Sequence, residues 1–83
     1  MKAYIRTVNG LVNMDDVQAI SWKSRKEVPE DDPFPISLIF FMKGGTTFLA
    51  NASIKSLYKT QERFKEMWTQ EYEVLDISEG DEE

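Results

Sequence analysis

Two runs of β-favouring residues around a glycine pair dominate the hydrophobic pattern of this chain. Residues 36–42 (ISLIFFM) and 46–52 (TTFLANA) flank Gly44–Gly45, and such a pair can adopt the positive φ angles of a two-residue hairpin turn. That turn pairs Phe41 with Phe48 on one face of the hairpin. The other face then holds Leu38, Phe40, Met42 and Leu49.

Both faces of the first strand of this hairpin are apolar, whereas a strand with one face in water alternates apolar and polar residues. Each face therefore needs a cover. We expect a C-terminal helix to pack on the side of Phe41 and Phe48, where the small Ala50 allows a close approach. Either curled N-terminal strands or a second protein molecule then covers the other side.

The segment before this hairpin predicts shorter strands and a long loop. Residues 3–8 end at Asn9–Gly10, a strong turn signal that predicts pairing of Val8 with Leu11. Residues 17–24 (VQAISWKS) resume an extended pattern.

Residues 25–35 contain all three prolines of the chain, which predicts an irregular connection. Phe34, between two of these prolines, is either an exposed anchor for a partner or a plug at one end of the core. We favour the plug.

An amphipathic helix of about 18 residues is predicted from residue 54 onward, with Asn51 or Ser53 as its N-cap. Its apolar side holds Leu57, Phe64 and Trp68, flanked by Met67, Ile54, Tyr72 and Tyr58. Its polar side holds Lys55, Lys59, Arg63, Glu66 and Gln70. Residues 73–78 could add a last edge strand.

These elements predict an α+β fold, an antiparallel meander of four or five strands with one C-terminal helix packed across the sheet. We expect a single domain over residues 1–78 and an acidic, disordered tail over residues 79–83.

Composition removes several classes of function. The 83 residues include no cysteine and no histidine, so disulfides, the usual zinc ligands, thiol nucleophiles and histidine-based triads are excluded. No motif for a cofactor or metal is present, and we expect neither, nor a small-molecule substrate. The longest apolar run is too short to span a bilayer, so we expect a cytoplasmic protein without a membrane partner.

The net charge of −5 comes from the C-terminal end. Residues 71–83 carry seven acidic residues and no basic one, which leaves ten basic against eight acidic residues, or +2, in residues 1–70. Two basic groups in this part are candidates for an anion-binding face that could contact nucleic acid. They are Lys55, Lys59 and Arg63 on the helix and Lys23, Arg25 and Lys26 after the third strand. Because acidic residues interleave with the helix group and follow the other group, we favour an ordinary solvated face.

The order of elements over residues 4–68 resembles that of a loose group of small bacterial and bacteriophage proteins of unassigned function. These have a curled antiparallel sheet with one C-terminal helix, and some are likened to pleckstrin-homology-like half barrels. The matching features are Asn9–Gly10, Asp15–Asp16–Val17, Gly44–Gly45 and Ser53. The resemblance implies a fold, but no catalytic residue.

We therefore expect a small non-enzymatic accessory or regulatory protein that acts by protein–protein interaction, with a homodimer as the concrete form. The expected contact surface consists of Leu38, Phe40, Met42, Leu49, Phe34 and Trp22. Two alternatives stay open. One is a nucleic-acid-associated protein that uses the basic helix face. The other is a mobile-element protein that uses its acidic tail to inhibit a host nucleic-acid enzyme.

Overall fold

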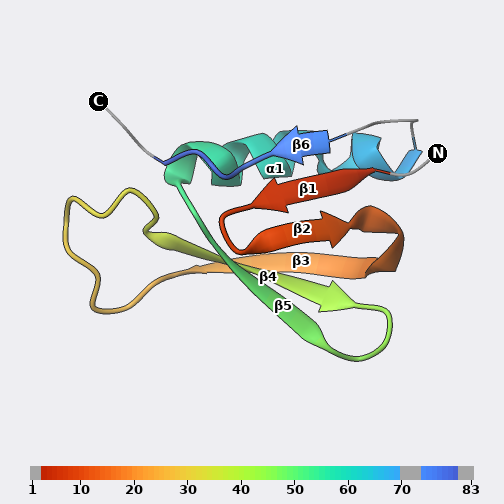
Figure 1. Cartoon of the computed structure of the whole chain (residues 1–83), viewed down its shortest axis with the longest axis horizontal. Coiled ribbons are helices and arrows are strands. Elements are labelled where there is room, and N and C mark those ends of the chain that lie inside the picture. Colours follow the sequence, from red (N-terminus) through yellow and green to blue (C-terminus); the bar gives the residue numbers. More distant parts are fainter. Residues whose placement is uncertain (1–2, 70–73, 81–83) are drawn as a thin grey trace.

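In the computed structural model of this chain, the described residues form six strands, rather than the predicted four or five, and one α-helix (Figure 1). The strands build two three-stranded sheets. The structure describes the backbone of residues 3–69 and 74–80 and the side chains of residues 3–63 and 74–80. The elements are β1 Tyr4–Thr7, β2 Gly10–Asn13, the short 3-10 turn η1 Met14–Asp16, β3 Val17–Ser24, β4 Ile36–Met42, β5 Thr47–Ala52, α1 Ile54–Thr69 and β6 Val74–Asp76. One sheet has the order β2-β1-β6 and the other the order β3-β4-β5. The predicted α+β class is confirmed.

The loop of the central hairpin has three residues rather than the predicted two. The N–H of Gly45 donates to the Met42 carbonyl at 3.0 Å, and the N–H of Met42 donates to the Thr46 carbonyl at 2.9 Å. Gly45 has a φ of +92°, so this is a type I turn followed by a left-handed glycine that forms a bulge. The extra loop residue moves the register by one, and Phe40 rather than Phe41 lies opposite Phe48.

This change of register exchanges the two faces of β4 relative to Phe48 on β5, because neighbouring residues of a strand point to opposite faces. Leu38 and Phe40 are 1% and 0% exposed and form part of the core, and the Phe40 and Phe48 rings pack 6.1 Å apart. Ile39 and Phe41 point to the outer face instead. The placement of Leu38 and Phe40 on an open surface is therefore wrong.

The first hairpin also turns at a different place. Thr7 pairs with Gly10, so the turn residues are Val8 and Asn9, and the predicted pairing of Val8 with Leu11 is wrong. The Thr7 hydroxyl explains this, because it accepts from the Asn9 N–H at 3.1 Å and donates to the Gly10 carbonyl at 2.7 Å. Gly10 has a φ of +144°, a backbone conformation that residues with a side chain rarely adopt. The position therefore favours glycine.

The last strand makes the sheet mixed. β6 pairs with β1 in parallel, with Leu75 beside Ile5, and the Ile77 N–H donates to the Arg6 carbonyl at 2.8 Å. The predicted antiparallel pairing is therefore correct between β1 and β2 and within β3–β4–β5, and it is wrong for β6. Leu75 and Ile77 are buried, which gives the segment an energetic reason to return to the body after the helix.

Helix α1 begins at the predicted cap, since the Ser56 N–H donates to Ser53 Oγ at 3.0 Å. Ser56, Leu57 and Thr60 are buried, and the helix contacts β4 and η1. Ile54 and Tyr58, which the pattern placed beside the apolar side, are exposed. The predicted positions of Phe64, Glu66, Met67, Trp68, Gln70 and Tyr72 lie outside the described side chains.

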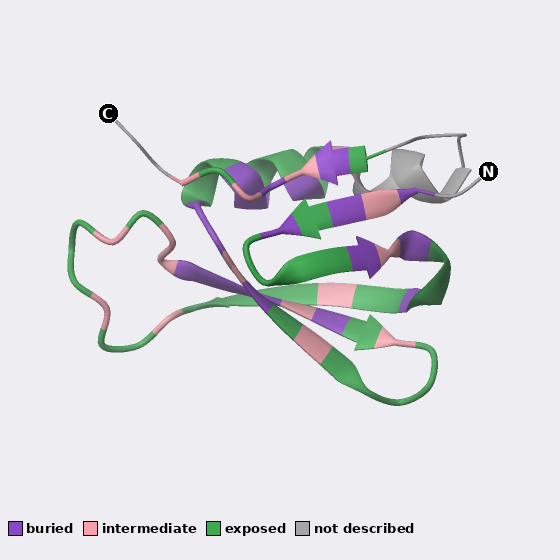
Figure 2. Ribbon diagram, viewed as in Figure 1, coloured by how far each residue is buried: buried purple, intermediate pink, exposed green. Residues whose placement is uncertain are grey.

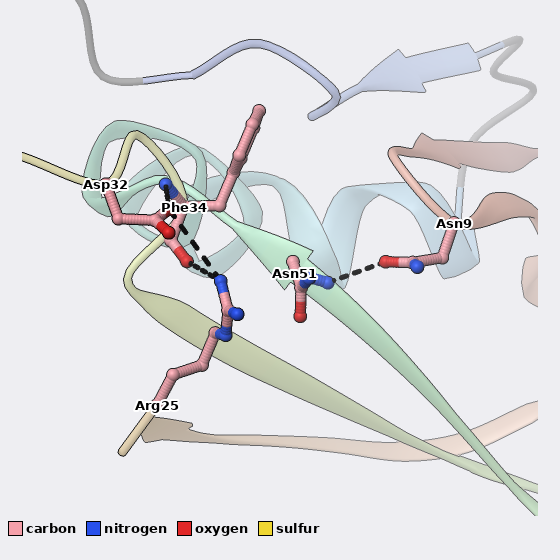
Figure 3. A network of polar contacts seen from close by, with 5 residues as sticks. All are labelled: Asn9, Arg25, Asp32, Phe34 and Asn51. Carbon is pink, nitrogen blue, oxygen red and sulfur yellow. Dashed lines mark hydrogen bonds and ion pairs between the residues drawn. The ribbon is translucent and has the colours of Figure 1, made fainter. Parts of the chain in front are cut away.

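The two sheets meet around a shared core. Asn51 N–H donates to Asn9 Oδ1 at 2.8 Å (Figure 3), β1 contacts β5, and the Lys43 N–H donates to the Asp16 carbonyl at 2.8 Å. The N-terminal strands and the helix therefore both help to cover the inner face of β3-β4-β5. The buried apolar residues are Ala3, Ile5, Val12, Met14, Val17, Ile36, Leu38, Phe40, Ala50, Ala52, Leu57, Leu75 and Ile77.

The observed register makes a direct prediction for stability. Phe40→Ala should lower the free energy of unfolding by about 3–5 kcal/mol, because it opens a cavity in the core. Leu49→Ala, on the neighbouring strand and 56% exposed, should change it by less than about 0.5 kcal/mol. Urea titrations followed by circular dichroism measure both, and equal losses would contradict the register.

Candidate functional site

The outer face of the β3-β4-β5 sheet carries two of the exposed large apolar side chains, Phe41 and Leu49. α1 lies on the opposite face, where Leu57 and Leu38 line a shared cleft. The register places nine residues on the outer face, Ala19, Ser21, Lys23, Ser37, Ile39, Phe41, Thr47, Leu49 and Asn51. Five of the nine are polar, but Lys23 is the one charged residue among them.

At the centre of this outer face, three apolar side chains lie on two adjacent strands. Ile39 is directly opposite Leu49, and Phe41 is two residues further along β4. Phe41 is 39% exposed and Leu49 is 56% exposed, whereas Ile39 is half-buried. Cross-strand neighbours on one face are within contact distance, so the three form one continuous patch.

The surface residues that the sequence pattern suggested are dispersed by the fold. Leu49 is on the outer face, and Leu38 and Phe40 are in the core. Met42 and Phe34 are half-buried. Trp22 is 46% exposed but lies opposite Leu38, so its side chain is on the inner side of the sheet. The sequence pattern did not place Ile39 and Phe41 on the exposed surface. A three-residue loop at Lys43–Gly45, in place of the predicted two-residue turn, would have placed them there.

Trp22 borders a cleft between β3 and the helix. Ile20, Ser21 and Trp22 line it from β3, Leu38 lines it from β4, and Leu57, Thr60 and Gln61 line it from α1. Its volume is about 200 Å³, whereas pockets for small-molecule ligands typically have about 300–1,000 Å³. The cleft is therefore of a size for one or two side chains of a partner.

A polar clamp shapes the proline-rich loop (Figure 3). Arg25 Nη1 donates to the Phe34 carbonyl at 2.6 Å and lies 3.7 Å from Asp32 Oδ1. Asp32 Oδ1 also accepts from the Phe34 N–H at 2.7 Å. Pro33 and Phe34 pack against Gly80. Phe34 thus contacts the C-terminal segment and is neither a free anchor nor a fully buried plug.

The two basic groups do not form one stripe. Lys23, Arg25 and Lys26 border a hollow beside Leu49 on the outer face, whereas the helix lies on the inner side of the sheet. Arg25 is also engaged in the loop clamp.

On the helix, Lys59 Nζ donates to the Asp76 carbonyl at 2.9 Å, and Lys55 borders a hollow beside Phe34. Arg63 is half-buried. Lys59 therefore helps to hold β6 against the helix, and the predicted anion-binding face is divided between two sides of the molecule.

Asp76, at the end of β6, is the one described group with a clear pKa shift. The Ser78 hydroxyl donates to Asp76 Oδ1 at 2.6 Å and the Ser78 N–H donates to it at 3.0 Å. These bonds lower the pKa of the carboxyl below 3.8, and the positive charges of Arg6 and Lys59 act in the same direction. The group closes the segment after β6.

The chain matches no protein-family model, and neither a curated protein nor a solved structure is similar to it. Its resemblance to small bacterial and bacteriophage proteins therefore stays a prediction. In the part of the chain that the structure describes, no helix is long and apolar enough to cross a membrane. The same residues contain no cluster of three or more acidic side chains that could hold a metal ion.

The shift at Asp76 predicts the effect of a single substitution. Ser78→Ala removes the hydroxyl donor, so the pKa of Asp76 should rise toward 3.8. Because the pKa of Asp76 is lower in the folded state than in the unfolded state, its ionised carboxyl stabilises the fold. This stabilisation is present above the unfolded-state pKa and is lost as the pH falls through the folded-state pKa. An NMR titration of the Asp76 carboxyl measures the shift, with Ser21→Ala as control. An unchanged pKa would show that the hydroxyl bond is not the main cause.

Proposed function

We propose that this protein is a non-enzymatic accessory or regulatory protein that acts by protein–protein interaction, and that its outer sheet face binds a second copy of the chain. The observation that carries the proposal is the outer face itself, with one charge in nine positions and an apolar centre of Ile39, Phe41 and Leu49. Large exposed apolar patches on small proteins usually mark interaction sites.

A second copy is the partner that this face suits best. A nearly neutral face can be apposed to an identical face without like-charge repulsion, which is what a two-fold symmetric contact requires. Lys23 lies at a corner of the sheet, at the end of β3. In a two-fold arrangement the lysines of the two copies can therefore occupy different corners.

The size of the face sets the expected strength of association. Three strands of about six residues cover roughly 15 Å by 20 Å, which is small for a stable interface. We therefore expect a dimer with a dissociation constant in the micromolar range.

The alternatives have less support. A nucleic-acid-binding helix face would need its basic groups together, and they are on two sides of the sheet. An inhibitor that mimics nucleic acid would need a projecting acidic tail. In the described part of that tail, Ser56 Oγ donates to the Glu79 carbonyl at 3.5 Å and Gly80 packs on Phe34. Residues 81–83 lie outside the described residues. We place the protein in the cytoplasm as part of the proposal, since a chain without cysteine suits a reducing compartment.

Matched leucine substitutions test the dimer. Wild-type protein should sediment as a dimer at tens of micromolar, and Leu49→Lys should be a monomer, because each copy would bury an unpaired charge at the contact. Leu11→Lys is the control, since Leu11 is 57% exposed on the other sheet, and it should leave the dimer intact. Circular dichroism confirms that both variants fold. A monomeric wild-type protein, or equal effects of the two substitutions, would refute the proposal.

A further inference from the structure

Strand β3 has a free edge. It is the longest of the described strands, with eight residues, and it ends the β3-β4-β5 sheet on one side. Most of its residues are exposed (Figure 2). An edge strand of this length presents unpaired N–H and C=O groups, to which another strand can bind.

The backbone groups that point away from β4 can be named. The Arg25 N–H donates to the Pro35 carbonyl, so Arg25 points its backbone groups toward the β4 side. Hydrogen-bonded and non-hydrogen-bonded pairs alternate along antiparallel strands. Ile20, Trp22 and Ser24 therefore direct their N–H and C=O groups to the open side, and none of these groups has a partner among the described residues.

The apolar cleft runs along the same edge. Its lining includes the consecutive residues Ile20, Ser21 and Trp22. Successive side chains of a strand point to opposite faces, so a cleft that touches all three borders the strand's edge and not only one face. A strand added to β3 would place every second side chain beside Trp22, Leu38 and Leu57, in a volume that suits a leucine.

The charge at one end of β3 indicates the chemistry of the partner. Lys23 and Lys26 are exposed, and no ion pair joins either of them to another described residue. Arg25 adds a positive charge between them. A strand that runs antiparallel to β3 would bring its N-terminal end to this group.

From these observations we propose that the free edge of β3 binds an extended segment of another protein by antiparallel strand addition. Alternate apolar side chains of the segment enter the cleft beside Trp22, and acidic residues at its N-terminal end meet Lys23 and Lys26. The site shares Lys23 with the outer face that we assign to the dimer, but its cleft beside Trp22 lies on the inner side of the sheet. Peptide binding and dimer formation can therefore be tested apart.

A set of synthetic peptides tests the strand addition. The probe is the fluorescein-labelled peptide DDDTLTLT, whose leucines would lie opposite Ile20 and Trp22. Residues opposite each other share a face and bond through the same backbone groups. N-methylation of the leucine amides should therefore abolish binding measured by fluorescence anisotropy, whereas N-methylation of the threonine amides should preserve it. The peptide KKKTLTLT should bind at least tenfold more weakly.

Variants of the protein locate the site. Trp22→Ala should weaken binding of the acidic peptide at least tenfold, and Tyr58→Ala should not, since Tyr58 is a 61% exposed aromatic residue outside the cleft lining. Lys23→Glu with Lys26→Glu should weaken it, and Lys43→Glu, at the central hairpin loop, should not.

The proposal is overturned if the acidic peptide does not bind at high micromolar concentration, or if leucine and threonine methylation have equal effects. It is also overturned if the Trp22→Ala variant is a monomer at concentrations at which the wild-type protein is a dimer. That result would show that the β3 edge pairs with a second copy of the chain. Retained peptide binding by monomeric Leu49→Lys would show that the edge site does not depend on the outer face.

Discussion

The hydrogen bonds of the Lys43–Gly45 loop decide which side of β4 faces the interior. The bulged glycine places Thr46 opposite Met42, and every cross-strand pair of the hairpin follows from that one alignment. Phe40 and Leu38 then enter the core, whereas Ile39 and Phe41 point outward. Since a shift of one residue exchanges the two faces of a strand, both the core and the candidate interaction surface depend on this short loop.

The rest of the chain closes around the face that this register buries. The Asn9–Asn51 hydrogen bond joins the first hairpin to β5. The parallel pairing of β6 with β1, together with the bond from Lys59 to the Asp76 carbonyl, returns the C-terminal segment to the body. These contacts connect distant parts of the chain, so the structure gains a shared core that no single hairpin of this size could supply.

Both proposed binding surfaces have the same structural origin. The β3-β4-β5 sheet receives the helix and the N-terminal strands on one face, and no described strand or helix covers the apolar centre of its other face. Its β3 edge is also unpaired in the described structure. One face can therefore serve self-association while the edge serves an extended partner. Apolar packing would drive the first contact, and backbone hydrogen bonds together with the charges near Lys23 would drive the second.

The sequence by itself determined the proline-rich loop, the Ser53 cap and the α+β class, because turn chemistry and hydrophobic periodicity are local properties. The predicted four or five strands are six in the structure. The sequence also implied correctly that β4 is apolar on both sides. Only the tertiary structure decided which of those sides is buried, that β6 pairs in parallel with β1, and that Trp22 borders a cleft. The buried side of β4 depends on a one-residue difference in the length of a glycine loop, and both lengths are compatible with the local sequence. The other two outcomes depend on contacts between residues far apart in the chain, which no local pattern encodes.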